Sequence, residues 1–160
     1  MKRVLLTGMS GTGKSSVIAE IRKRGFKAID MDEPGWSEHD HDGNQQWCEP
    51  RLQEAIDSAS EAVLFISGCA ENQVNFYPQF TDIILLSAPA EVLEERLRTR
   101  TNNLYGKRPE ELEEIFSYLK TVEPLLRRGA TYEIETTIPL DQVVHEVLGH
   151  VCLTSPFWFL

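Results

Sequence analysis

Residues 8–15 read Gly8-Met9-Ser10-Gly11-Thr12-Gly13-Lys14-Ser15. An apolar run at 4–6 precedes them, and a helical pattern begins at residue 14. The order strand, glycine loop, helix is the context that the phosphate-binding pattern G-x-x-x-x-G-K-[ST] requires. Glycines let backbone N–H groups turn inward, and a helix N-terminus adds its positive end. The stretch therefore predicts a site for nucleotide phosphates; a glycine turn that only caps a strand is the alternative.

The predicted contacts to the nucleotide come from this loop and the first helical turn. Lys14 is expected to reach the β and γ phosphates of ATP, and the Ser15 hydroxyl to ligand Mg²⁺. The predicted phosphate-binding set is Gly8, Ser10, Gly11, Thr12, Gly13, Lys14, Ser15 and Ser16.

Length and charge limit the class of protein. The chain has 160 residues, which predicts one compact domain over 1–160, and a formal net charge of −9. This charge disfavours nucleic acid or an anionic membrane as partners, and no apolar run of membrane-spanning length is present. Cys48, Cys69 and Cys152 are scattered without C-x-x-C spacing, which indicates reduced thiols and a cytoplasmic protein. The oligomeric state stays open.

Apolar runs and helical patterns alternate along the chain. Strands are expected at 3–7, 26–30, 62–67, 82–87 and 131–136, and helices at 14–24, 50–60, 89–101, 109–128 and 140–150. The alternation predicts an α/β fold: a five-stranded parallel sheet with helices on both faces, and ligands at the carboxyl ends of the strands. Pro124 is expected to interrupt the helix over 109–128.

Two aspartates follow the second expected strand. Asp30 and Asp32, two residues apart on an extended segment, project to the same side. The strand at 62–67 ends without an acidic residue, so these two are the predicted carboxylates near Ser15 and its magnesium ion. A pair of acids in a solvated turn is the alternative.

Residues 33–50 are expected to form a long irregular loop on the acceptor side of the site. Trp36 and Trp47 either stack on an acceptor or anchor the loop to the core. His39 and His41 have no pattern that fixes metal geometry, so a solvated loop is favoured over a metal site. Arg51 opens the next expected helix, where its guanidinium would face the region beyond Asp32; an ordinary surface arginine is the alternative.

Three arginines of the helix expected at 89–101 differ in their environment. Arg96 and Arg100 fall on its apolar stripe, whereas Arg98 lies opposite and can pair with Glu94. A charge on an apolar face needs a partner, so Arg96 and Arg100 are expected near the nucleotide.

Residues 101–109 are polar and basic in an acidic chain, which predicts a mobile lid. Gly106 would supply its flexibility, and Lys107 and Arg108 would meet the transferring phosphate. A plain connection between helices is the alternative. The apolar segment 155–160 has no assigned role.

These motifs resemble the shikimate kinase branch of the nucleoside-monophosphate-kinase-like (adenylate kinase-like) P-loop enzymes. Asp30-Met31-Asp32 is similar to that family's Asp-x-Asp, Arg51-Leu52-Gln53-Glu54 to its Arg-x-x-Glu, and Arg108-Pro109 to its lid. The resemblance implies that Asp30 serves magnesium and that Asp32 holds the acceptor hydroxyl as base. It also implies that Arg51 and the region of Gly68 bind the acceptor, and that Arg100 and Pro139 enclose adenine.

Two departures bear on the acceptor. Gly68-Cys69-Ala70 stands where the family has three glycines, and Val122-Glu123-Pro124-Leu125-Leu126 stands where it has Arg-x-Pro-Leu-Tyr. Since that arginine grips the shikimate carboxylate, Val122 disfavours shikimate itself.

The sequence therefore predicts an ATP-dependent small-molecule kinase that moves the γ-phosphoryl group of MgATP to a hydroxyl. Lys14, Asp32 and Arg108 are its predicted catalytic residues. One alternative is a nucleoside monophosphate kinase, although Arg51 is the single arginine between residues 25 and 95. Another is a regulatory nucleotide switch, although no Asn-Lys-x-Asp guanine signature is present. The acceptor is expected to be hydroxylated and either neutral or cationic, such as a sugar, nucleoside or amino-alcohol.

Overall fold

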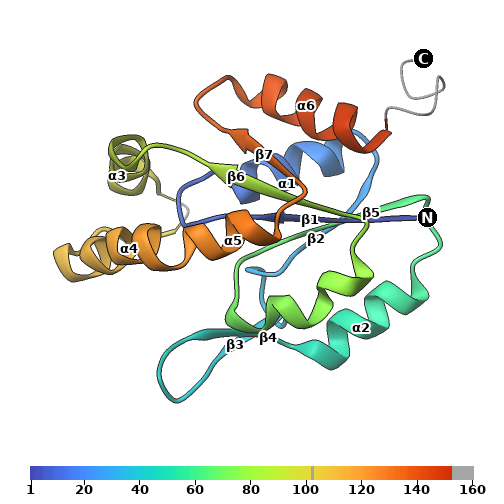
Figure 1. Ribbon diagram of the computed structural model, residues 1–160, viewed down its shortest axis with the longest axis horizontal. Helices are drawn as coiled ribbons and strands as arrows, with labels where there is room; N and C mark the ends of the chain where they lie inside the picture. Colours follow the sequence, from blue (N-terminus) through green and yellow to red (C-terminus); the bar gives the residue numbers. More distant parts are fainter. Residues whose placement is uncertain (102, 153–160) are drawn as a thin grey trace.

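The computed structural model describes residues 1–101 and 103–152, and a parallel sheet forms its centre (Figure 1). Its five strands lie in the order β2-β5-β1-β6-β7, and every neighbouring pair is parallel. This confirms the predicted α/β fold. The strands, each within one residue of its predicted bounds, are β1 (Lys2–Thr7), β2 (Lys27–Asp30), β5 (Val63–Ser67), β6 (Asp82–Ser87) and β7 (Tyr132–Glu135).

Helices cover both faces of this sheet (Figure 1). Helices α1 (Lys14–Lys23) and α6 (Leu140–Cys152) pack on one face, where Phe65 and Leu86 lie fully buried. Helix α2 (Glu49–Ser58) and the 3₁₀ helix η1 (Glu71–Gln79), which the sequence analysis missed, pack on the other. Helix α3 (Ala90–Thr99) follows β6.

The helix expected over 109–128 is interrupted, as predicted. Helix α4 (Pro109–Thr121) ends before Val122, and α5 (Glu123–Gly129) begins directly after it. Pro124 lies in the first turn of α5, where a missing N–H removes no helical hydrogen bond.

The prediction of an irregular loop over 33–50 was wrong. Strands β3 (Ser37–His39) and β4 (Gln45–Trp47) form an antiparallel hairpin. Its turn is closed by the Asp40 carboxylate, whose Oδ1 accepts hydrogen bonds from the backbone N–H groups of Asp42 and Asn44, at 2.9 Å each. The N–H of Asn44 in particular holds the pKa of Asp40 below its ordinary value. An Asp-Gly dipeptide at 42–43 was the sequence signal for this turn.

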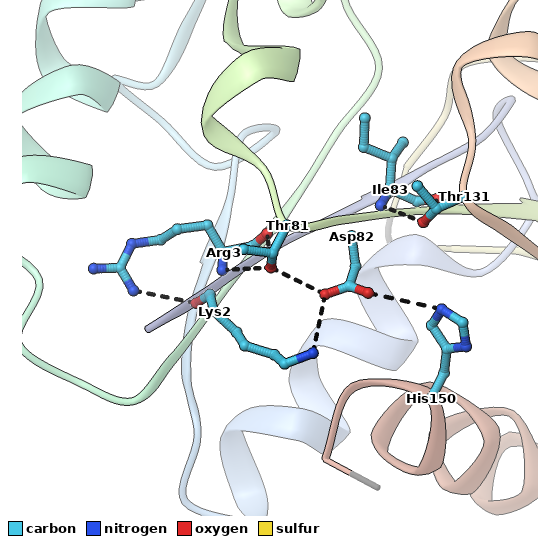
Figure 2. A network of polar contacts seen from close by, with 7 residues as sticks. All are labelled: Lys2, Arg3, Thr81, Asp82, Ile83, Thr131 and His150. Atoms are coloured by element: carbon cyan, nitrogen blue, oxygen red, sulfur yellow. Dashed lines mark hydrogen bonds and ion pairs between the residues drawn. The ribbon is translucent and has the colours of Figure 1, made fainter. Parts of the chain in front are cut away.

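A polar network holds the edge of the sheet where β1 and β6 begin (Figure 2). The buried Asp82 carboxylate lies 3.0 Å from the Thr81 hydroxyl, and 3.7 Å from both Lys2 Nζ and His150 Nε2. His150 also stacks on the Tyr132 ring, with centroids 4.3 Å apart. These contacts fasten the end of α6 to the start of β6.

In the part of the chain that the structure describes, no helix is long and apolar enough to cross a membrane. The apolar segment 155–160 lies outside the described residues.

Candidate nucleotide and acceptor site

The loop between β1 and α1 needs glycine at two positions. A Cβ on Gly8 would lie 2.3 Å from the Leu86 carbonyl oxygen, so no other residue fits there without a shift of the backbone. Gly13 has φ +98° and is the N-cap of α1. Thr12 closes the loop, donating from its hydroxyl to the Met9 carbonyl at 2.8 Å. The loop therefore brings its backbone close to β6 and presents the open N-terminus of α1.

A cavity of about 880 Å³ opens above this loop. Lys14 lies at its floor, where Nζ donates to the carbonyl oxygens of Gly8 (2.6 Å) and Met9 (3.1 Å). The ammonium group is thus held over the loop, where it can meet a phosphate oxygen. The predicted phosphate-binding residues that line the cavity are Ser10, Gly11, Thr12, Gly13, Lys14, Ser15 and Ser16.

Three oxygen-bearing side chains meet at the carboxyl ends of β2 and β5. Asp30 is 7% exposed, and its Oδ2 accepts a hydrogen bond from the Ser15 hydroxyl at 3.1 Å. Ser67 pairs with Asp30 in register, so both side chains lie on one face of the sheet. Its fully buried hydroxyl has no hydrogen-bond partner among the described residues. A buried hydroxyl beside a serine–aspartate pair fits a hydrated magnesium ion. Ser67 carries no carboxylate, so no sequence pattern marked the end of β5 as part of a magnesium site.

Asp32 extends from the same segment into the cavity. Its backbone N–H donates to Asp30 Oδ1 at 2.9 Å, so the two aspartates are fixed relative to each other. Its exposed carboxylate accepts a hydrogen bond from Gln45 Nε2 at 3.0 Å. The structure thus brings the predicted base and the predicted magnesium residues to one site.

Arg96 has a role that the sequence analysis did not specify. It lines the cavity, but its guanidinium donates to the Gly11 carbonyl (3.1 Å) and to the hydroxyl (2.9 Å) and carbonyl of Thr136. Partial burial lowers the pKa of this guanidinium. Arg96 therefore ties the phosphate loop to the segment between β7 and α6. Arg98, by contrast, is exposed and pairs with Glu94 at 3.1 Å, as predicted.

Arg100 also lines the cavity. Its guanidinium donates to the carbonyl oxygens of Asn103 (3.0 Å) and Tyr105, and burial lowers its pKa. Ile138 and Leu140, on either side of Pro139 in sequence, line the cavity as well. An adenine site between Arg100 and Pro139 stays a prediction.

In the expected lid, Lys107 and Gly106 are placed differently from the prediction. Lys107 Nζ donates to the Arg98 carbonyl at 2.8 Å, because the last carbonyls of α3 lack helical partners and attract a cation. Gly106 is buried: a Cβ there would lie 3.0 Å from side-chain carbons of Leu97 and Ile115. Arg108 is exposed at the N-cap of α4. Its catalytic role, and the lid itself, stay predictions.

On the acceptor side, both tryptophans belong to the hairpin region. Trp47 is buried against Gly68 and Phe76, so it anchors the hairpin to the core. The Arg51 guanidinium lies over the Trp36 ring, 4.0 Å from its centroid. Neither Arg51 nor Gly68 is among the residues that line the cavity. Their predicted contact with an acceptor therefore stays a prediction.

Cys69, which follows Gly68, lies beside the loop. Burial raises the pKa of its thiol, while the nearby Lys14 ammonium opposes that change. The buried Gln73 donates to the Thr7 hydroxyl at 3.1 Å and accepts from the Ala70 N–H at 2.9 Å. Gln73 thus fixes the segment after β5 to the end of β1, a contact no sequence pattern indicated.

Comparison with known proteins agrees with this geometry. Residues 4–117 match the family described as "AAA domain". A protein of Archaeoglobus fulgidus named "Putative adenylate kinase" is 31% identical over 149 residues, which span 90% of this chain and 79% of that protein.

Solved structures share the fold at lower identity. The shikimate kinase of Acinetobacter baumannii, solved with shikimate, has a TM-score of 0.68 at 20% identity, over 98% of this chain and 96% of that one. A gluconokinase of Sinorhizobium meliloti 1021 has a TM-score of 0.62 at 20% identity, over 99% of this chain and 95% of that one. The chain belongs to the AAA domain family, and its fold is that of the small P-loop kinases.

Proposed function

We propose that this chain is an ATP-dependent kinase that transfers the γ-phosphoryl group of MgATP to a hydroxyl of a small molecule. The observation that carries the proposal is the meeting of Lys14, the Ser15–Asp30 pair and Asp32 in one cavity. The similar proteins include a shikimate kinase and a gluconokinase, which supports a phosphotransferase.

Each residue then has a defined task. The N–H groups of 8–15 and the Lys14 ammonium would bind the β and γ phosphates. Ser15 and Asp30, with Ser67 beside Asp30 on the neighbouring strand, would hold Mg²⁺. The bound Mg²⁺ would neutralise charge on the phosphates. The oxygen of the acceptor hydroxyl bonds to the γ-phosphorus, and the bond between that phosphorus and the oxygen of the leaving ADP breaks. Asp32 accepts the proton that the hydroxyl loses. Arg108, from a lid over 101–109, would stabilise the transferred group.

The acceptor that fits this site carries no negative charge. Residues 31–50 contain no lysine or arginine, while their acids are Asp32, Glu33, Glu38, Asp40, Asp42 and Glu49. Arg51 is the nearest cation in sequence, and it rests on Trp36. Desolvating an anion among carboxylates without a paired cation is strongly unfavourable. A neutral or amine-bearing alcohol meets no such cost.

A nucleoside monophosphate kinase is the second candidate, because the Archaeoglobus relative is named for adenylate kinase. Its acceptor phosphate is a dianion, which needs more than one cation. Arg51 is the single arginine between residues 25 and 95, which disfavours this candidate. A slow nucleotide switch is the third candidate and differs by showing no acceptor-dependent turnover. The free thiols of Cys48 and Cys69 are consistent with a cytoplasmic enzyme.

A charge-matched series of polyols tests the proposal. Gluconate, sorbitol and glucamine share one carbon skeleton and end in a carboxylate, a hydroxymethyl and an aminomethyl group. ADP formation from MgATP is measured with each, and with shikimate and AMP. We expect turnover with sorbitol or glucamine and negligible turnover with the three anions.

Lys14→Ala is the control for the site, and it should lose turnover by at least about three orders of magnitude, as loss of a group that stabilises the transition state does. Efficient turnover of AMP would favour the second candidate. Turnover that survives Lys14→Ala contradicts the proposed site.

A further inference from the structure

The hairpin beside the site is fixed at its base. The Asn72 side chain clamps Trp47, accepting from its backbone N–H at 2.8 Å and donating to its carbonyl at 3.0 Å. The Ser37 hydroxyl donates to the Met31 carbonyl at 2.7 Å, and Trp47 is 3% exposed. The position of β4 is therefore set by the core of the protein and not by the exposed turn.

Two adjacent glutamines of β4 consequently have separate partners. Gln45 Nε2 donates to Asp32 Oδ1 at 3.0 Å. Gln46 projects from the opposite face of the strand, and its Nε2 lies 3.2 Å from Asp40 Oδ2 and 3.3 Å from Glu71 Oε2. Two neighbouring residues are thus both glutamine, and one of them contacts the proposed base while the other points away from it.

The Gln45–Asp32 contact leaves one acceptor atom on each of the two side chains without a hydrogen bond from any described residue. Within residues 1–101 and 103–151, Asp32 Oδ2 receives no hydrogen bond, and neither does Gln45 Oε1. Nε2 and Oδ1 are 3.0 Å apart, and each remaining oxygen is bonded to the same carbon as one of these atoms, so one small molecule can reach both oxygens. Two donors on neighbouring carbons of one molecule could then meet one oxygen each.

We propose that Gln45 is a positioning and specificity-determining residue for the proposed phosphoryl transfer, on which this inference rests. Its amide N–H fixes the exposed Asp32 carboxylate so that Oδ2 receives the reacting hydroxyl. Its amide oxygen binds a second donor of the acceptor, a hydroxyl or an ammonium group on the adjacent carbon. The preferred acceptor class is therefore a vicinal diol or a 1,2-amino-alcohol.

The Gln45–Asp32 hydrogen bond would raise the rate of transfer by orienting the Asp32 carboxylate. An exposed carboxylate samples many rotations, and only some of them aim an oxygen at the incoming hydroxyl. Holding the reacting groups in place removes that entropy from the barrier. Loss of a hydrogen bond to a charged group corresponds to about a 10- to 100-fold change. We expect the change in kcat and in acceptor KM, with the KM for ATP unaltered.

Gln45→Met removes the amide at nearly constant length, and Gln46→Met is the matched control on the same strand. ADP formation from MgATP is measured with water alone, with sorbitol, and with 1,2- and 1,3-propanediol. Gln45→Met should lower the rate about 10- to 100-fold, and Gln46→Met should equal the wild type. The wild type should prefer the 1,2-diol, and Gln45→Met should lose that preference.

The outcomes separate this inference from the proposed function. Equal rates for Gln45→Met and Gln46→Met, with ADP formation abolished in Lys14→Ala, overturn the role of Gln45 and leave the kinase intact. A 1,3-diol preference that Gln45→Met does not change overturns its role in specificity. ADP formation that is absent in the wild type, or that persists in Lys14→Ala, refutes the kinase and the inference together. Thermal denaturation of both glutamine variants verifies that each is folded.

Discussion

Arg96→Lys tests the contact between the phosphate loop and the segment between β7 and α6. The guanidinium makes three hydrogen bonds, to the Gly11 carbonyl and to the hydroxyl and carbonyl of Thr136. Lysine keeps the charge, but its single nitrogen does not span both sides of this contact. The substitution should therefore leave the electrostatics of the site largely unchanged and remove the link.

The magnitude follows from the bonds that are lost. About two of the three are lost, and a hydrogen bond from a charged donor contributes about 1.5–3 kcal/mol. Water satisfies part of this half-buried position, so the net loss in free energy of unfolding is about 2–3 kcal/mol. For a chain of this length that corresponds to a Tm lower by about 4–12 °C. The freed Gly11 carbonyl should also raise the KM for ATP.

The assay is urea denaturation and ATP kinetics on Arg96→Lys beside Arg98→Lys. Arg98 lies on the same helix, its side chain is 65% exposed, and its partner Glu94 is one turn away. A pair of this kind contributes about 0.3–0.5 kcal/mol, so Arg98→Lys should resemble the wild type. Coinciding unfolding midpoints for the two variants would show that the Arg96 link contributes nothing, and the reasoning would be wrong.

Substitutions at Arg108, Arg51, Asp82 and Glu133 test four further roles. Arg108→Ala should lower kcat more than it weakens ATP binding, and a collapse of ATP affinity with kcat unchanged would contradict a role in the transition state. Arg51→Ala should change the KM for sorbitol by less than about threefold, since an exposed cation–π contact contributes only about 0.5–1 kcal/mol; a large rise would place Arg51 at the acceptor. Asp82→Ala removes a buried carboxylate with three polar neighbours and should lower the free energy of unfolding by about 1–3 kcal/mol in denaturation experiments. Hydrogen bonding from Arg127 lowers the pKa of Glu133. The ionised Glu133 should therefore stabilise the fold fully at neutral pH, and this stabilisation should fade as the carboxylate is protonated below about pH 4. The Glu133 side chain is 36% exposed, so its contribution is small. Glu133→Gln should reduce the loss in free energy of unfolding between neutral and acidic pH by less than about 1 kcal/mol.

The sheet and the phosphate loop were predictable because their determinants are local. The central strands β1, β5 and β6 are buried along nearly their whole length, so each contains a short apolar run that the sequence reveals directly. The loop depends on glycines at fixed spacing, and the clash that a Cβ on Gly8 would make with Leu86 is the structural reason for the first of them. The break before Pro124 was likewise local.

The hairpin was not predictable in the same way. Its strands have three residues each, too few for an alternating pattern, and its stability comes from distant partners. Asn72 is 25 positions beyond the Trp47 backbone that it clamps. Arg96 is a comparable case: its place on an apolar stripe indicated a buried partner, but Gly11 and Thr136 lie 85 and 40 positions away. A helical wheel identifies the need for a partner and not its identity.

Arg51 shows how a matching motif can leave a role undetermined. It begins an Arg-x-x-Glu segment similar to one that binds an acceptor, yet here it rests on Trp36 and fills the space beside Gly35, where a Cβ would lie 2.2 Å from Nη1. Releasing it from Trp36 costs little, so that contact alone does not exclude an anionic acceptor. The proposed exclusion rests instead on residues 31–50, which contain six acids and no lysine or arginine. On the proposed function, the class of acceptor therefore depends on the hairpin segment, which the Arg-x-x-Glu motif does not contain.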